Sequence, residues 1–144
     1  MPLFNPTTSN PYKFGAYRAA AANSGNAAFL QCVFDTKEFD TNTNYSTSTG
    51  NYTVPVAGFY QFNWGIELSA AAQDFVACLY KNGVEFRRGL GRNNANTSKT
   101  SGGAGFLQLA ANDTIGVYVF AGATTALNIG QAQCYLNGYL VSIT

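Results

Sequence analysis

Residues 58–68, with the sequence GFYQFNWGIEL, alternate between apolar and polar positions. One set of alternate positions is wholly apolar or aromatic: Tyr60, Phe62, Trp64, Ile66 and Leu68. Successive side chains of a β-strand point to opposite faces, so this period of two predicts a long strand with one face on a core. Glu67 belongs to the other set and is expected to point toward solvent or an interface.

Shorter strand-like segments occupy most of the remaining chain, at residues 14–18, 28–34, 36–40, 52–56, 75–80, 84–86, 104–109, 114–120 and 132–143. The strongest turn signal is Asn82-Gly83, because both residues tolerate positive φ and the flanking segments resemble strands. Residues 19–26 are too short for an isolated helix and are expected to form a loop, and the polar residues 91–103 are expected to form a mobile loop. The pattern predicts an all-β jelly-roll sandwich of eight to ten antiparallel strands.

The chain of 144 residues is long enough for one domain with its own core. Prolines at positions 2, 6 and 11 interrupt strand pairing near the N-terminus, so residues 1–13 are expected to form an arm and residues 14–144 the domain. Phe4, Pro6 and Pro11 are the candidates for anchoring this arm on a neighbouring molecule. Residues 1–15 lack the pattern of a secretory signal, so export without such a signal is expected.

Only 10% of the residues are charged, against about 25% in an ordinary globular protein. A surface poor in charge suits burial between subunits, since interface centres are depleted of charged residues. The net charge of +1 does not provide the basic patch that nucleic-acid binding needs. The sequence also contains no apolar run near the ~20 residues that cross a membrane, so we expect neither nucleic-acid binding nor membrane insertion.

Candidate catalytic and metal-binding residues are few. The chain has no histidine, which excludes Ser-His and Cys-His nucleophiles and argues against an enzyme. Cys32, Cys78 and Cys134 lie in apolar segments and are expected to be buried thiols, the alternative being one disulfide and a free thiol. No cofactor is expected. A calcium site at Asp35, Glu38 and Asp40 is the alternative to a polar strand edge, without a matched ligand motif.

Several segments share their order and spacing with one family. They are Phe34-Asp35, Tyr45, Gly50, the run YTVPVAGFYQF at 52–62, Lys81-Asn82-Gly83, Ser101-Gly102-Gly103, Leu107-Gln108-Leu109, Asn112-Asp113 with Ile115 and Val117, and the closing YLNGYL at 135–140. Together they resemble the globular head domain of complement component 1q, within the tumour necrosis factor-like superfamily. The resemblance covers residues 14–143 and implies a jelly roll that forms homotrimers. The collagen-like Gly-X-Y stalk of most animal members does not occur in this sequence.

The resemblance and the 21 aromatic residues together predict a trimer formed through one side of the sandwich. A jelly roll of this size does not need so many aromatic residues for its own core. The candidate axis-facing residues are Tyr118, on the strand at 114–120, and Tyr139, on the final strand.

Two functions fit these features. The first is a non-enzymatic, trimeric virion surface protein of a bacteriophage, either a capsid decoration protein or a fibre-tip component, with capsid or tail proteins as partners. The second is a stand-alone extracellular recognition module that binds a carbohydrate or a protein, such as a host surface glycan or protein, through its loops. The sequence does not choose between them.

Overall fold

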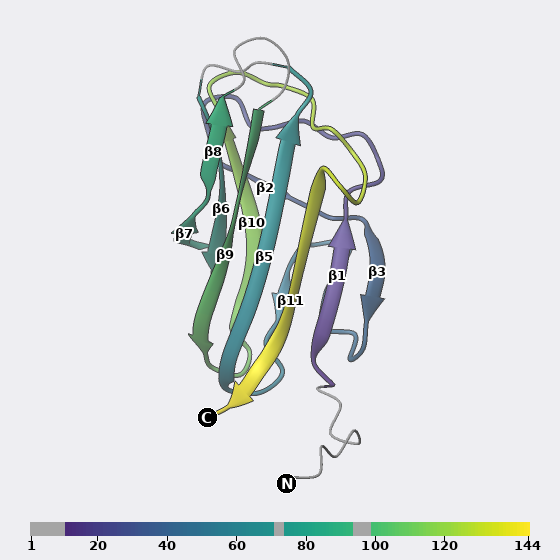
Figure 1. The fold of residues 1–144 in the computed structure, drawn as a ribbon, viewed down its shortest axis with the longest axis vertical. Coiled ribbons are helices and arrows are strands. Elements are labelled where there is room, and N and C mark those ends of the chain that lie inside the picture. The colour runs from purple at the N-terminus through teal and green to yellow at the C-terminus, as the bar shows by residue number, and fades with distance from the viewer. Residues whose placement is uncertain (1–10, 71–73, 94–98) are drawn as a thin grey trace, which may run out of the picture.

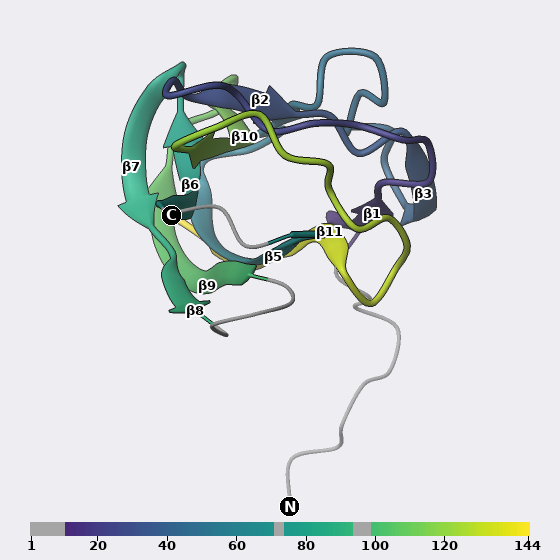
Figure 2. The same cartoon turned by 90° about the horizontal axis from the view of Figure 1, so that it is seen from above.

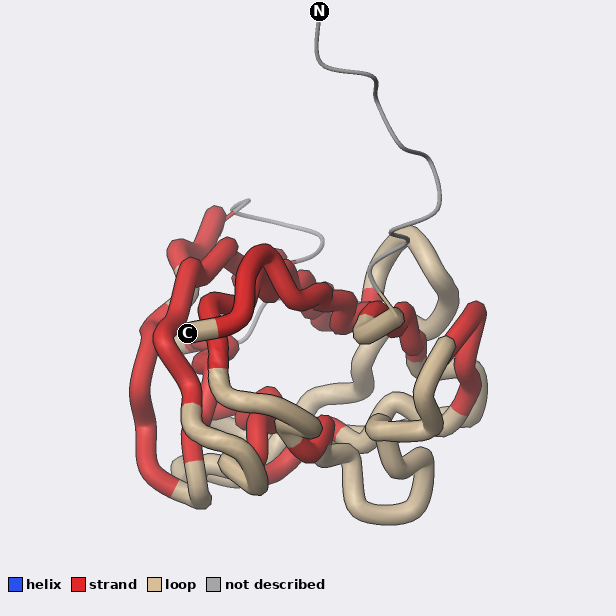
Figure 3. Tube along the Cα trace, turned by 90° about the horizontal axis from the view of Figure 1, so that it is seen from below, coloured by secondary structure: helices blue, strands red, loops and turns tan. Residues whose placement is uncertain are grey.

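The computed structural model describes residues 11–70, 74–93 and 99–144, and these contain strands and loops without a helix (Figure 3). The first strands are β1 (Lys13–Tyr17), β2 (Leu30–Cys32), β3 (Thr36–Asp40), β4 (Tyr52–Thr53) and β5 (Gly58–Leu68). The others are β6 (Phe75–Lys81), β7 (Val84–Arg88), β8 (Leu90–Asn93), β9 (Lys99–Leu109), β10 (Thr114–Ala121) and β11 (Cys134–Ile143).

The strands form two antiparallel sheets that face each other (Figures 1 and 2). The six-stranded sheet has the order β3-β1-β11-β5-β9-β8. The five-stranded sheet has the order β2-β10-β6-β7, with β4 paired to β10. Neighbours in each sheet are mostly distant in sequence, as in a Greek-key sandwich. The predicted all-β jelly roll is confirmed.

The core lies between the sheets, and β5 supplies much of it. The predicted bounds of β5 are those of the structure, and its five predicted core side chains are each at most 2% exposed. Trp64 Nε1 donates a hydrogen bond to the carbonyl oxygen of Ala77 on β6, 3.2 Å away. A buried indole N–H needs such a partner, and here the bond links one sheet to the other.

The predicted loop at residues 91–103 is wrong at residues 91–93 and 99–103, whereas residues 94–98 lie outside the described residues. Residues 90–93 form β8, and β9 begins at Lys99 and pairs with β5 along all eleven of its residues. The segment looked like a loop because its residues are small and polar. Ser101 is nonetheless buried, where its Oγ accepts the backbone N–H of Ala77 at 2.9 Å.

Other strand bounds also differ from the prediction. The described chain has eleven strands rather than eight to ten, and the strand without a predicted counterpart is β8, while β2 and β4 are shorter than predicted. The predicted strand at 52–56 ends at Thr53, and the final strand begins at Cys134 rather than at residue 132. Residues 19–26 form a loop, as expected.

The Asn82-Gly83 hairpin is confirmed. Both residues have positive φ, of 51° and 78°, which matches the type I′ turn favoured between twisted strands. Asn82 Oδ1 accepts the backbone N–H of Thr114 at 2.8 Å, and its Nδ2 donates to Asp113 Oδ1 at 2.7 Å. The turn between β6 and β7 is therefore bound to the start of β10.

The described chain enters and leaves the sandwich at the same end. Lys13 pairs with Tyr139 near the C-terminus, and Thr144 closes the chain nearby (Figure 1). The loops that contain residues 19–29 and 122–133 lie at the opposite end (Figure 1). None of the described residues belongs to a helix that could span a membrane.

Candidate interaction face

The outer face of the six-stranded sheet carries large apolar side chains. We call it the aromatic face and define it by Phe39, Phe59, Phe106, Tyr135, Tyr139, Val141 and Ile143. Phe106, Tyr139 and Val141 are 57%, 45% and 49% exposed. The five aromatic residues fall on the outward half of the strand alternation, where polar residues are usual, whereas Val141 lies at a register shift and Ile143 pairs with Gly58 at the end of β11. Exposed apolar side chains gathered on one face mark a candidate interaction site.

Aromatic side chains pair across the centre of this face. The rings of Phe59 on β5 and Phe106 on β9 stack with centroids 5.6 Å apart and an interplanar angle of 8°. Gln61 is the direct partner of Phe106 on one side and of Tyr139 on the other. Tyr139, Gln61 and Phe106 thus form one row across three adjacent strands. Positions 59 and 106 belong to the polar half of the alternation in their strands. An aromatic residue at each of them was therefore the signal in the sequence for aromatic side chains on this outer face.

Next to this row lies a cluster of uncharged amides. Asn63 on β5 is directly opposite Asn137 on β11, and Asn63 Nδ2 donates to Asn137 Oδ1 at 2.9 Å. Gln61 Nε2 donates to Asn63 Oδ1 at 3.2 Å. The centre of the face therefore combines aromatic rings with paired amides. The amides themselves can be buried without desolvating an ion, whereas Lys13, opposite Tyr139 on β1, lies at the margin of the face.

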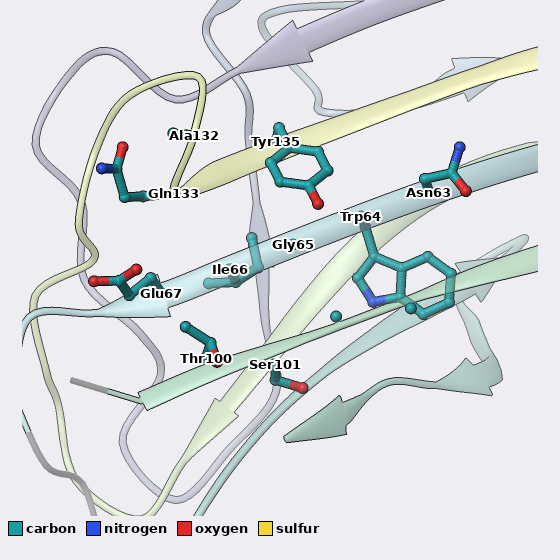
Figure 4. A pocket seen from close by; sticks show the side chains of 12 residues that line it. Asn63, Trp64, Gly65, Ile66, Glu67, Thr100, Ser101, Ala132, Gln133 and Tyr135 are labelled. Carbon is teal, nitrogen blue, oxygen red and sulfur yellow. The ribbon is translucent and has the colours of Figure 1, made fainter. Parts of the chain in front are cut away.

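A hollow of about 590 Å³ opens near the loop end of the same face (Figure 4). Gly65 and Gly102 pair across its floor, and the ring of Tyr135 lies over Gly65, where a Cβ would come within 2.7 Å of it. Glu67 lines one end and points away from the core, as predicted, and its Oε1 accepts Asn128 Nδ2 at 2.6 Å. The hollow can receive a side chain or loop of another molecule.

A second apolar surface lies at the β7–β8 side of the sandwich. We call it the apolar edge and define it by Val84 and Phe86 on β7, which are 69% and 37% exposed. Arg87 lies over the Phe86 ring, with its Cζ 4.6 Å from the centroid. The edge belongs to the five-stranded sheet, whereas the exposed Leu90 on β8 pairs with Gly102 and lies on the same outer face of the six-stranded sheet as Tyr135.

The structure does not bring the predicted axis residues Tyr118 and Tyr139 together. Tyr139 lies on β11, in the six-stranded sheet, whereas Tyr118 lies on β10 and faces outward from the other sheet. Tyr118 stacks on Tyr80 with centroids 4.0 Å apart and donates its hydroxyl to Gln31 Oε1 at 3.2 Å. One side of the sandwich therefore cannot supply both tyrosines. The geometry leaves Tyr139 as the candidate on the aromatic face.

Of the N-terminal anchor candidates, Phe4 and Pro6 lie outside the described residues. Pro11 is exposed, and its carbonyl oxygen accepts a hydrogen bond from Thr41 Oγ1. The carbonyl of Tyr12 accepts the backbone N–H of Leu140 at 2.9 Å. The chain is therefore attached to the sandwich from Pro11 onward.

The acidic residues considered for calcium have other partners. Asp35 accepts the backbone N–H groups of Ala19 and Ala20 at 2.7 and 2.9 Å. Burial raises the pKa of Asp35, but these bonds and Arg18 outweigh it and hold the pKa below its ordinary value. Asp40 pairs with Lys37 Nζ at 2.8 Å. Within the described residues no three acidic, cysteine or histidine side chains gather as metal ligands, so this set does not fit a calcium ion.

Asp113 has a structural role at the β6–β7 turn. The Asp113 carboxylate forms an ion pair with Lys81 Nζ at 2.9 Å. It also accepts hydrogen bonds from Asn82 Nδ2 at 2.7 Å and from the backbone N–H of Ala110 at 2.8 Å. Burial raises its pKa, but the hydrogen bonds from Asn82, Lys81 and Ala110 outweigh burial and lower the pKa overall.

The three cysteines are buried and unbridged, as expected.

The two facing antiparallel sheets and their strand order define a jelly-roll sandwich. Complement and tumour necrosis factor-like proteins share this fold. The globular domain of zebrafish complement 1qA superposes with a TM-score of 0.69 at 18% identity, over 92% of this chain and 99% of that one. Eiger TNF from S. frugiperda gives 0.70 at 12% identity, over 92% and 94% of the two chains. Murine APRIL gives 0.69 at 13% identity, over 90% and 98%.

The family model of the C1q domain matches residues 14–141. The chain therefore belongs to the C1q domain family, as the sequence resemblance implied. No curated protein sequence matches it.

Proposed function

We propose that this protein is a non-enzymatic binding and structural module that assembles as a homotrimer. The observation that carries the proposal is the aromatic face, where Phe106 and Tyr139 remain 57% and 45% exposed beside uncharged amides. Exposed aromatic side chains are typical of the centre of a protein–protein interface, and the charged Lys13, opposite Tyr139 on β1, lies at the margin of this face.

The presence of two apolar surfaces favours threefold over twofold symmetry. A twofold interface joins the same patch on both subunits, whereas the contacts of a cyclic trimer join two different patches. In the proposed trimer the apolar edge around Phe86 packs on the aromatic face of the next copy. Tyr139 then lies where the three faces converge.

The trimer is proposed to act on the surface of a bacteriophage virion, as a capsid decoration protein or a fibre-tip component, with capsid or tail proteins as partners. Supporting this role, the chain enters and leaves the sandwich at one end, while the loops of residues 19–29 and 122–133 lie at the other (Figure 1). A trimer held by its N-terminal arm would present its loops outward. The low charged fraction of 10% also suits close-packed assembly.

The alternative is an extracellular recognition module that binds a carbohydrate or a protein through its loops. This alternative is favoured by the hydrogen bonds that hold the loops of residues 19–29 and 122–133 at the end opposite the termini. Ser24 and Thr125 exchange hydrogen bonds, and the backbone N–H of Asn128 donates to the carbonyl of Glu67 at 2.8 Å. Loops fixed in this way can recognise a ligand without a large loss of entropy.

One experiment separates the two roles. Phage particles from the organism that encodes the chain are purified on a density gradient, and their proteins are quantified by mass spectrometry. A virion component must be present in stoichiometric amounts, in multiples of three per particle. If the chain is absent from particles, while the purified protein binds host surface glycans or proteins, the recognition role is correct.

A further inference from the structure

Two buried cysteines face each other between the sheets. Cys32 ends β2 in the five-stranded sheet, and Cys134 begins β11 in the six-stranded sheet. Their sulfur atoms are 3.7 Å apart, and the residues are 5% and 0% exposed. The two residues are 102 positions apart in the chain, so their meeting is a product of the fold.

A hollow lies beside one of the two cysteines. It has a volume of about 220 Å³ and is lined by Cys32, together with Arg18, Gln31, Val33, Val119 and Leu127. The hydrogen bond with Cys134 and burial raise the pKa of the Cys32 thiol, so thiolate chemistry there is slow at neutral pH. Of the two cysteines, only Cys32 lines this hollow, so it is the one that we expect a reagent to reach first.

We propose that Cys32 and Cys134 are a redox-active pair that closes into a disulfide between the two sheets in oxidising surroundings. A disulfide has an S–S length of about 2.05 Å, so the sulfur atoms must approach by about 1.7 Å from their separation of 3.7 Å. The edge strand β2 can supply this movement, because it is only three residues long and pairs with β10 alone.

The oxidant is a small-molecule disulfide such as glutathione disulfide. The Cys32 thiolate attacks one sulfur of the oxidant and releases one glutathione thiolate. The Cys134 thiolate then attacks Cys32 Sγ, which forms the protein disulfide and releases the second glutathione. The protein loses two electrons and two protons, and the oxidant leaves as two molecules of reduced glutathione.

Cys78 provides an internal control. It lies on β6 opposite Tyr118 and Arg88, on the outward side of the five-stranded sheet, whereas Cys32 and Cys134 belong to the core between the sheets. Cys78 therefore cannot bridge to either of them without unfolding. Each pairing that involves Cys78 would contradict the proposal.

The test uses the full chain, reduced and then incubated with glutathione disulfide at about pH 8.5, which raises the thiolate fraction of each cysteine above its value at neutral pH. Free thiols are alkylated under denaturing conditions, and non-reducing peptide maps identify the bridge. We expect one alkylated residue, Cys78, and one bridge from Cys32 to Cys134. The bridge encloses about 100 residues, so the melting temperature of the oxidised protein should rise by about 5 °C or more.

The matched variant Cys78→Ser must oxidise as the wild type does, whereas Cys32→Ser and Cys134→Ser must not form an intramolecular bridge. Three alkylated thiols in the oxidised wild type would overturn the proposal. So would a stable glutathione adduct on Cys32 or a bridge that includes Cys78. Because the peptide map of the wild type decides the matter, poor folding of a serine variant does not affect the test.

Discussion

The rings of Phe59 and Phe106 lie parallel on the outside of the sandwich, with centroids 5.6 Å apart, and Phe106 is 57% exposed. A stacked pair at this position adds little to the core of a single copy. It fits a surface that is buried when copies of the chain assemble.

Replacing Tyr139 with Asp should dissociate the trimer. The substitution would place three carboxylates near the threefold axis in a desolvated centre, at a cost of several kcal/mol. Light scattering at micromolar concentration measures the mass of the variant. Tyr118→Asp is the control, because Tyr118 lies on the other sheet. It should lower the melting temperature through loss of the Tyr80 stack but leave the trimer intact.

Replacing Gly138 with Ala should destabilise the fold by about 1–3 kcal/mol, the usual cost of overpacking a core. A Cβ at this position would lie 2.5 Å from Cδ1 of the buried Phe62 ring. Gly105→Ala is the matched control, since its Cβ would meet its nearest neighbour at an ordinary 3.6 Å. Urea titrations followed by tryptophan fluorescence compare the two. Equal stability of both variants would mean that the packing around Phe62 is looser than described.

Replacing Asp113 with Asn should weaken the protein at neutral pH and reduce its sensitivity to acid. The pKa of Asp113 is lower in the folded state, so its contribution is present above the unfolded pKa of about 3.9 and is lost as the pH falls through the folded pKa. We expect a loss of about 1 kcal/mol at pH 7. Melting temperatures measured from pH 7 to pH 2 should fall less steeply for the variant.

Glu38→Gln is the control for this acid dependence, because Glu38 is an exposed carboxylate on β3. Its melting curve should follow the wild type at each pH. Parallel curves for Asp113→Asn and the wild type would show that the turn contacts of Asp113 contribute no pH-dependent stability.

Local patterns in the sequence predicted much of the fold. The strict alternation through β5 and the Asn82-Gly83 turn depend on neighbouring residues, and the structure confirms both. The strand in residues 99–103 was missed because its small polar residues owe their strand structure to pairing with β5. Such long-range pairing leaves no periodic signal in the segment itself.

The candidate site was predicted only in part. Tyr139 was selected from the final strand, but the sequence could not show that Tyr118 faces outward from the other sheet. The order of strands in a Greek-key sandwich is set by contacts between distant segments. The stack of Phe59 on Phe106 and the Asn63–Asn137 hydrogen bond depend on this order, so they became visible only in three dimensions.

The native mass of the purified chain tests the trimer most directly. Sedimentation equilibrium at micromolar concentration should give a single species of three times the chain mass of 15.4 kDa. A monomer would contradict the account, because the aromatic face would then remain in solvent. A dimer would contradict it as well, since the aromatic face and the apolar edge would not be joined in a threefold arrangement.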